Sequence, residues 1–487
     1  MLSRLLLASL LCASSALAAS RYDIGAPVLR DVYVDSAHGS DSNGGMSRSD
    51  SLRTLTEAWN RIPRGTELTE TGYRIQLLAG EYAEEALPNF LESRYGTPRF
   101  PIIIQSADAS RSAHLRGDLN VFDTRYLYLL GLDITPQPAG DVFHCERCDH
   151  VLIRDSKFDG GARAAHDMTK VNQSQFVFIE DSDLSGADDN SIDFVAVQYG
   201  HVVRNRISNA GDWCMYAKGG SAYLTIEENE IFGCGTGGFT AGQGTGLQFM
   251  TPPWIHYEAY DIKAMNNVIH DTEGAGLGVN GGYNILFAYN TLYRVGTRSH
   301  MLEVVYGARS CDGMPGDEGR ERCQQYLDLG GWGTTVVDDG TNYERIPNRN
   351  VFVYDNILYN PAGVVSPQLF TVVGATNLQI RGNVIFNGSD DTGIGDEIRA
   401  ENSVNLFEPQ LGDDLRPVPN SNVLRATTYA IPDFSWSDAP RPPLAPQGAL
   451  TNRVVTDRDG VVRAAPSTPG AYVGGASIPR RRRGVAH

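Results

Sequence analysis

Short runs of alternating apolar and polar residues recur along the chain between residues 151 and 388. Each run ends in Asn or Asp, followed by a few polar residues and a turn. Alternation over four to eight residues predicts strands that bury one face. The recurring segments are VLIRDSKFDG, VFIEDSDLSG, HVVRNRISNAG, LTIEENEIFGCG, DIKAMNNVIHDT, ILFAYNTLYRVG, VFVYDNILYN and LQIRGNVIFNG.

The Asn or Asp of each segment serves as a marker, and successive markers are 26, 24, 24, 38, 23, 66 and 27 residues apart. A period near 24 with two long insertions predicts an all-β fold, a right-handed parallel β-helix with one coil per repeat. Asn and Gly supply the left-handed corners, and stacked asparagines bridge the turns. Leucine-rich repeats and β-propellers would need different repeat patterns. The markers are Asp155, Asp181, Asn205, Asn229, Asn267, Asn290, Asn356 and Asn383.

The two ends of the chain depart from this pattern. Residues 1–18 have a positive start, a short apolar run and an Ala-x-Ala site, which predicts a signal peptide and a secreted or periplasmic protein. Residues 19–110 are expected to form a cap and the first coils, including a helix with Leu55, Ala58, Trp59 and Ile62 on one face. Residues 111–410 are assigned to the catalytic β-helix, and the Pro-rich residues 411–487 to an irregular tail packed on it.

The net charge of −17 argues against general binding to nucleic acid or to an anionic membrane. An acidic protein that holds an acidic polymer needs a bound cation or a local basic patch. We expect a monomer.

Six cysteines remain after the signal peptide, which indicates disulfides in an exported chain. Cys214 and Cys234 are nearly one repeat apart and could face each other on stacked coils, and Cys311 and Cys323 could close a loop. Cys145 and Cys148 could form a small disulfide or half of a zinc site.

Counting back from the markers places Asp167, Asp193 and Lys218 in roughly the same lane on three consecutive coils, with neighbours about 5 Å apart. Asp188 and Asp189 lie in the turn that leads into Asp193. Four carboxylates in one place repel each other unless a cation is bound, and hard oxygen ligands in an exported protein indicate Ca²⁺.

Each of these residues also has a purely structural interpretation. Asp188 and Asp189 suit an ordinary turn, and Lys218 could be a solvated strand lysine. Asp193 is different, because an aspartate between apolar strand residues needs a partner. A lysine beside Ca²⁺, partly desolvated by Trp213 and Tyr216, would have a lowered pKa and could act as a base. The following Gly219 and Gly220 leave room for a ligand.

The segments YVDSAHGSDSNGG and LRTLTEAWN, the Asn-marked coils, ADDNSIDF and YAKGG together resemble polysaccharide lyase family nine, a family with pectate lyases among its members. The resemblance implies calcium bound by Asp167, Asp188, Asp189 and Asp193, with Asn190 as an alternative to Asp188. It also implies β-elimination on an acidic, uronic-acid-containing polysaccharide with Lys218 as the base.

Three further residues are candidates for substrate binding. Trp254 and Tyr257 in QFMTPPWIHYEAY could stack on sugar rings, and Arg298 could bind a carboxylate. The alternatives are loop packing for the aromatic residues and a solvated turn for the arginine. At the level of the whole protein, the alternatives are a β-helix glycoside hydrolase, a C5-epimerase and a non-catalytic polysaccharide-binding β-helix.

Overall fold

The computed structural model describes residues 21–136, 140–162, 165–310, 321, 328–329, 336–337, 344–363, 370–388, 403–464 and 467–474. The expected signal peptide lies outside the described residues. Among the described residues, no helix is long and apolar enough to cross a membrane.

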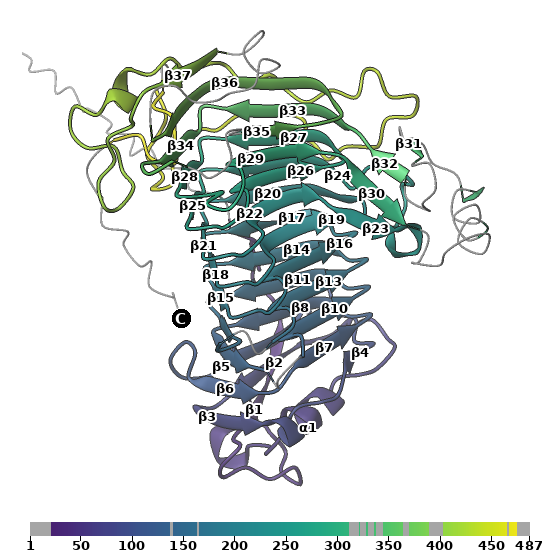
Figure 1. The fold of residues 1–487 in the computed structure, drawn as a ribbon. Coiled ribbons are helices and arrows are strands. Elements are labelled where there is room, and N and C mark those ends of the chain that lie inside the picture. Colours follow the sequence, from purple (N-terminus) through teal and green to yellow (C-terminus); the bar gives the residue numbers. More distant parts are fainter. Residues whose placement is uncertain are drawn as a thin grey trace, which may run out of the picture.

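Parallel strands stack into one column, with the N-terminal coils at one end and the C-terminal segment at the other (Figure 1). One sheet has ten strands and a second has 23, the latter made of two parallel ladders that meet at β36 (Ala375–Asn387). Successive strands of the chain therefore belong to three parallel ladders, and the predicted parallel β-helix is confirmed.

The ten-stranded sheet contains, in spatial order, β35 (Phe370–Val372), β29 (Leu302–Val305), β26 (Leu277–Asn280), β22 (Gly237–Gly242), β19 (Trp213–Lys218), β16 (Ile192–Val195), β13 (Thr169–Asn172), β10 (Phe143–Glu146), β7 (Leu119–Phe122) and β4 (Leu91–Glu92).

The first ladder of the large sheet contains β1 (Leu29–Val34), β2 (Gly72–Leu77), β5 (Ile102–Ser106), β8 (Arg125–Leu130), β11 (Asp149–Arg154), β14 (Gln175–Glu180), β17 (Gln198–Val203), β20 (Ser221–Glu227), β24 (Ala259–Met265), β27 (Gly282–Ala288), β33 (Asn348–Tyr354) and β36.

The second ladder contains β3 (Gly80–Ala83), β6 (Ala113–Arg116), β9 (Leu132–Thr135), β12 (Lys157–Asp159), β15 (Asp183–Ser185), β18 (Arg206–Ser208), β21 (Glu230–Phe232), β25 (Val268–His270), β28 (Thr291–Tyr293), β34 (Ile357–Asn360), β36 and β37 (Ser403–Leu406). A small separate sheet joins β23 (Gly244–Gly246), β30 (Gly307–Ser310), β31 (Val336–Val337) and β32 (Glu344–Ile346).

A buried ladder of side chains bridges one corner of successive coils. Each marker asparagine from Asn205 to Asn356 donates two hydrogen bonds to the side-chain oxygen of the next marker asparagine. One comes from its side-chain amide and the other from its backbone N–H. The predicted asparagine stack is therefore confirmed. The first two markers were wrong by one residue: Ser156 and Ser182 occupy the ladder, while Asp155 and Asp181 lie at the left-handed position before it.

The N-terminal end of the column carries α1 (Leu55–Asn60) (Figure 1). Thr54 caps this helix by accepting a hydrogen bond from the backbone N–H of Glu57. All four residues of the predicted apolar face are buried in the core that continues through the coils: Leu55, Ala58, Trp59 and Ile62.

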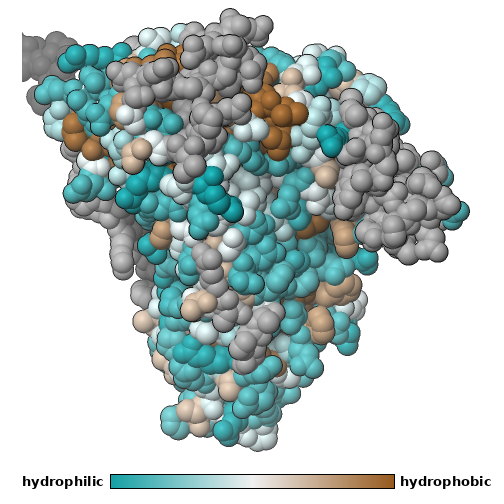
Figure 2. Space-filling view, in the orientation of Figure 1, coloured by the Kyte–Doolittle hydropathy of each residue, from teal (hydrophilic) through white to brown (hydrophobic). Residues whose placement is uncertain are grey.

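The C-terminal residues 407–464 and 467–474 run over the outside of the last coils with little regular structure apart from the short η4 (Asn422–Arg425). Phe434 and Trp436 pack on buried tyrosines and other apolar side chains of the large sheet. Hydrophobic residues gather near this end of the column, whereas the surface over the lower coils is mainly hydrophilic (Figure 2).

Candidate functional site

The candidate site lies on the outward face of the ten-stranded sheet, on β10, β13, β16 and β19. Strand pairing aligns His144 with Lys170, Lys170 with Asp193, and Asp193 with Tyr216. Paired positions of neighbouring parallel strands are about 4.8 Å apart. The sheet thus presents an imidazole, an ammonium, a carboxylate and a phenol in one row.

Lys170 is the charge at the centre of this row. Its Nζ lies 2.8 Å from Oδ2 of Asp193 and 3.0 Å from Oδ2 of Asp167, and both carboxylates are almost fully buried. Burial alone would lower the pKa of Lys170, but the carboxylates of Asp193 and Asp167 outweigh burial and raise it. Lys170 is therefore an ammonium that already neutralises part of the acidic cluster.

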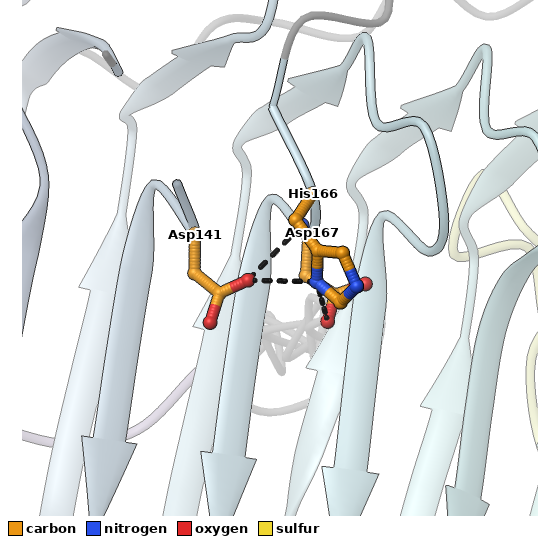
Figure 3. Close-up of side chains that lie close together, drawn as sticks. All are labelled: Asp141, His166 and Asp167. Atoms are coloured by element: carbon orange, nitrogen blue, oxygen red, sulfur yellow. Dashed lines mark hydrogen bonds and ion pairs between the residues drawn. The ribbon is translucent and has the colours of Figure 1, made fainter. Parts of the chain in front are cut away.

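His166 extends the cluster beyond the start of β13 (Figure 3). Its Nδ1 lies 3.1 Å from Asp141 and 3.2 Å from Asp167, and its Nε2 lies 3.7 Å from Asp189. Burial opposes the charged imidazole, but Asp167 and Asp141 raise the pKa of His166 above its usual value. Ligand atoms of Asp141, His166 and Asp167 all lie within 4.8 Å of one another, which makes this trio a possible metal-binding group.

The four carboxylates predicted to bind calcium are not equivalent. Asp188 is exposed, whereas Asn190 is fully buried and donates its backbone N–H to Oδ1 of Asp167 at 2.9 Å. Burial and the nearby carboxylates, chiefly Asp167, raise the pKa of Asp189. The geometry therefore favours Asn190 over Asp188 as a neighbour of Asp167.

Among the described residues, four buried oxygens on or beside β13 and β16 have no hydrogen-bond partner: Oγ1 of Thr169, Oδ1 of Asn172, Oδ1 of Asn190 and Oδ1 of Asp193. Those of Asn190 and Asp193 belong to the acidic cluster. A buried acceptor without a partner is costly, and a hard cation is one way to satisfy it. The oxygen donors present here fit Ca²⁺ chemically, although Lys170 already holds one oxygen each of Asp167 and Asp193.

The marker count predicted that Lys218 shares the lane of Asp193, and this prediction is wrong. Lys218 pairs with Val195, two positions further along the strand, so it lies on the same outward face. Val195 thus pairs with Lys218, and Gln198 of the next strand pairs with Ala222. Two residues lie between Val195 and Gln198, but three lie between Lys218 and Ala222. This longer turn shifted the residue count from the marker back to Lys218.

The surroundings of Lys218 are polar and aromatic. Its Nζ donates to Oε1 of Gln243 at 2.8 Å and lies 4.1 Å from the centre of the Tyr216 ring. Gly219 and Gly220 form a left-handed turn, and a side chain at either position would meet Thr245 or Met250. The room expected there for a ligand is thus occupied by the protein itself.

Tyr216 connects Lys218 to the acidic cluster. It is almost completely buried, and burial followed by the charges of Asp193 and Asp167 raises its pKa strongly. Its phenol therefore keeps its proton. A disulfide between Cys214 and Cys234, as predicted, fixes the strand that carries both Tyr216 and Lys218.

Cys145 and Cys148 also form a disulfide, so they are not half of a zinc site. Cys311 and Cys323 lie outside the described residues.

The three predicted substrate-binding residues have different environments. Tyr257 is buried and packs edge to face on Tyr283, which is loop packing. Trp254 is half-buried. Arg298 is 62% exposed, 3.8 Å from Glu273, and donates to the backbone oxygen of Gly235. No contact brings these three residues to Lys218 within the part of the chain that the structure describes.

Sequence reasoning missed several members of the cluster: Asp141, His166, Lys170 and Gln243. Lys170 did give a signal, because Lys170 and Lys218 each precede their marker by eleven residues. His166 and Asp141 lie in turns, where polar residues are common and carry little information.

Comparison with known proteins supports the fold. Residues 141–309 match the family model of the right-handed β-helix region. The protein is similar to pectate lyase Pel9A, with 14% identity over 93% of this chain and 98% of that chain, at a TM-score of 0.51. It is also similar to XylC, solved in complex with xylose, with 11% identity over 91% of this chain and 98% of that chain, at a TM-score of 0.52. No curated protein matches the sequence.

Proposed function

We propose that the protein is an exported polysaccharide lyase that cleaves a uronic-acid-containing polymer by β-elimination, with Lys218 as the base. The observation that carries this proposal is the unbroken run of charged and polar side chains across β13, β16 and β19. Lys170 bridges Asp167 and Asp193, Asp193 adjoins Tyr216, and the ring of Tyr216 contacts Lys218. The fold shared with pectate lyase Pel9A is compatible with this activity.

The carboxylates of the cluster, those of Asp141, Asp167, Asp189 and Asp193, outnumber its cations Lys170 and His166, on a protein of net charge −17. A substrate carboxylate therefore needs a bound cation at this face. Calcium, held by Asp167, Asp189, Asn190 and Asp193, would bind the substrate carboxylate and draw charge from it, which makes the C5 proton more acidic. The unpartnered oxygens of Asn190 and Asp193 support this assignment.

The proton transfers involve two neighbouring side chains. In its neutral form Lys218 takes the C5 proton, the electron pair forms the C4–C5 double bond, and the bond from C4 to the glycosidic oxygen breaks. Gln243 accepts a hydrogen bond from Lys218 and so orients its Nζ. The departing oxygen takes up a proton from Tyr216, from another tyrosine or from water.

The test is the ultraviolet absorbance of the unsaturated uronate product on a panel of pectate, alginate, glucuronan and glycosaminoglycans, with and without a calcium chelator. Lys218→Ala should lose on the order of a hundredfold or more of the activity. Lys157→Ala is the matched control, because Lys157 lies on another sheet in a partly exposed pair with Asp159. It should retain full activity.

Other products would replace the proposal. New reducing ends without the absorbance would indicate a glycoside hydrolase, and a changed uronate without chain cleavage an epimerase. Absence of any product on all these polymers would leave a polysaccharide-binding β-helix.

A further inference from the structure

A cavity of about 390 Å³ lies on a different sheet from the candidate active site. Its floor consists of side chains from β14, β17, β20 and β24, including Phe176, Tyr199 and Tyr223. Residues 446–449 of the C-terminal segment form its opposite wall. Thr225 and Lys263, which pair across β20 and β24, add polar groups.

The aromatic part of the floor belongs to a ladder of rings on five consecutive coils. Successive centroids are 4.2, 4.3, 4.9 and 5.0 Å apart, and the rings are nearly parallel. All five residues are half-buried. The ladder consists of Tyr126, His150, Phe176, Tyr199 and Tyr223.

Every residue of this ladder has a left-handed backbone, with φ between 53° and 65°. The same lane continues on the next four coils with the same backbone, but there it carries Asp261, Asn284, Asn350 and Asn377. Asp and Asn tolerate left-handed φ, whereas bulky aromatic residues there are strained. The fold therefore needs only a polar residue at this corner, and the aromatic residues call for another reason.

The cover over this lane changes at the same point. Trp436 of the C-terminal segment donates to Asp261 at 3.0 Å, and Asn350 donates to the backbone of Ser435. The polar part of the lane thus serves to attach the C-terminal segment. The aromatic part ends in the cavity, where the rim supplies the charged Lys263 and the hydroxyl of Thr225.

We propose that this cavity, lined by Phe176, Tyr199 and Tyr223, forms a second carbohydrate-binding site, which holds the polymer away from the catalytic face. A sugar chain combines apolar C–H surface with hydroxyls, and the wall of stacked rings with polar groups at its rim matches both. The choice of carbohydrate over another amphipathic ligand rests on the proposed function. The binding site itself does not depend on Lys218.

The lane supplies its own test substitution. Tyr199→Asn and Tyr223→Asn remove rings but introduce the residue that the same lane carries three coils further on, so the fold should be retained. Tyr126→Asn, at the end of the ladder remote from the cavity, is the matched control. Thermal unfolding of each variant verifies that it is folded.

Affinity electrophoresis through gels that contain polygalacturonate, alginate or xylan measures binding, with all variants in a Lys218→Ala background so that no polymer is consumed. Two sites on one chain bind one polymer with avidity, so the Tyr199→Asn/Tyr223→Asn variant should bind on the order of tenfold more weakly, and Tyr126→Asn as the parent does. Equal retardation of the double variant and the parent overturns the second site, as does no retardation of the parent by any of the three polymers. If the wild-type protein shows no lyase activity on any polymer, but retardation in the gels still depends on Tyr199 and Tyr223, the proposed function is overturned and the second site is not.

Discussion

Replacement of Lys170 by Met is the most direct test of the acidic cluster. The substitution keeps a side chain of similar length and removes the ammonium that lies 2.8 Å from Asp193 and 3.0 Å from Asp167. These carboxylates are 3% and 0% exposed, so water cannot take over the role of the lysine. The variant therefore buries uncompensated negative charge.

The size of the effect follows from burial. Removal of one partner of a buried ion pair destabilises a protein by about 3–5 kcal/mol. Lys157→Met is the control, because Lys157 and its partner Asp159 are 42% and 37% exposed. An exposed pair of this kind contributes about 0–1 kcal/mol. The two substitutions should thus differ severalfold in their loss of unfolding free energy.

Urea unfolding at neutral pH measures both losses. Calcium should stabilise the variant more than the wild type, because the variant cluster carries one more negative charge. Equal losses for the two lysines, or equal stabilisation of variant and wild type by calcium, would refute the neutralising role of Lys170.

Two further outcomes are expected. Asn267→Ala removes side-chain hydrogen bonds to Asn229, Asn290 and the backbone of Ile226 in the core, so it should cost about 3–5 kcal/mol in denaturant unfolding, and a loss under 1 kcal/mol would contradict the ladder. Burial raises the pKa of Glu227 to about 7 near Arg463 of the C-terminal segment, so its stabilising contribution is complete below about pH 4.5 and is lost as the pH rises through 7. Limited proteolysis of the C-terminal segment should therefore be slower at about pH 5 than at about pH 8 in the wild type, and this difference should be smaller in Glu227→Gln. The same pH dependence in both proteins would count against the role of Glu227.

The coil pattern was predictable because it depends on residues that the core demands. A buried amide that bridges two coils leaves few alternatives to asparagine, so the markers from Asn205 onward were correct. Ser156 and Ser182 fill the same position in the first coils, with a hydroxyl that also accepts a backbone N–H. Next to each of them an aspartate suits the left-handed corner, and the sequence alone gave no means to choose between the two.

The site was predictable only up to the lengths of the turns. Alternation ensures that Lys218 and Asp193 point to the same side of the sheet, and this part of the prediction holds. One extra residue after Lys218 moves it along the strand, and Lys170, which precedes its marker by the same eleven residues, takes the place beside Asp193. Side-chain contacts between coils depend on register, which a single inserted residue changes.

The stacked coils explain how two separate surfaces can evolve on one column. Inward positions are fixed by the core and the corners by backbone conformation, but an outward lane can change residue type from one coil to the next. The left-handed corner lane illustrates this freedom: it is aromatic up to Tyr223 and polar from Asp261, with the same φ on both sides. Since the backbone conformation is constant along this lane, it does not explain the change from aromatic to polar residues. We attribute the change to the contacts that the lane makes with the C-terminal segment. The C-terminal segment hydrogen-bonds to the polar part, whereas a cavity separates residues 446–449 of that segment from the rings of Phe176, Tyr199 and Tyr223.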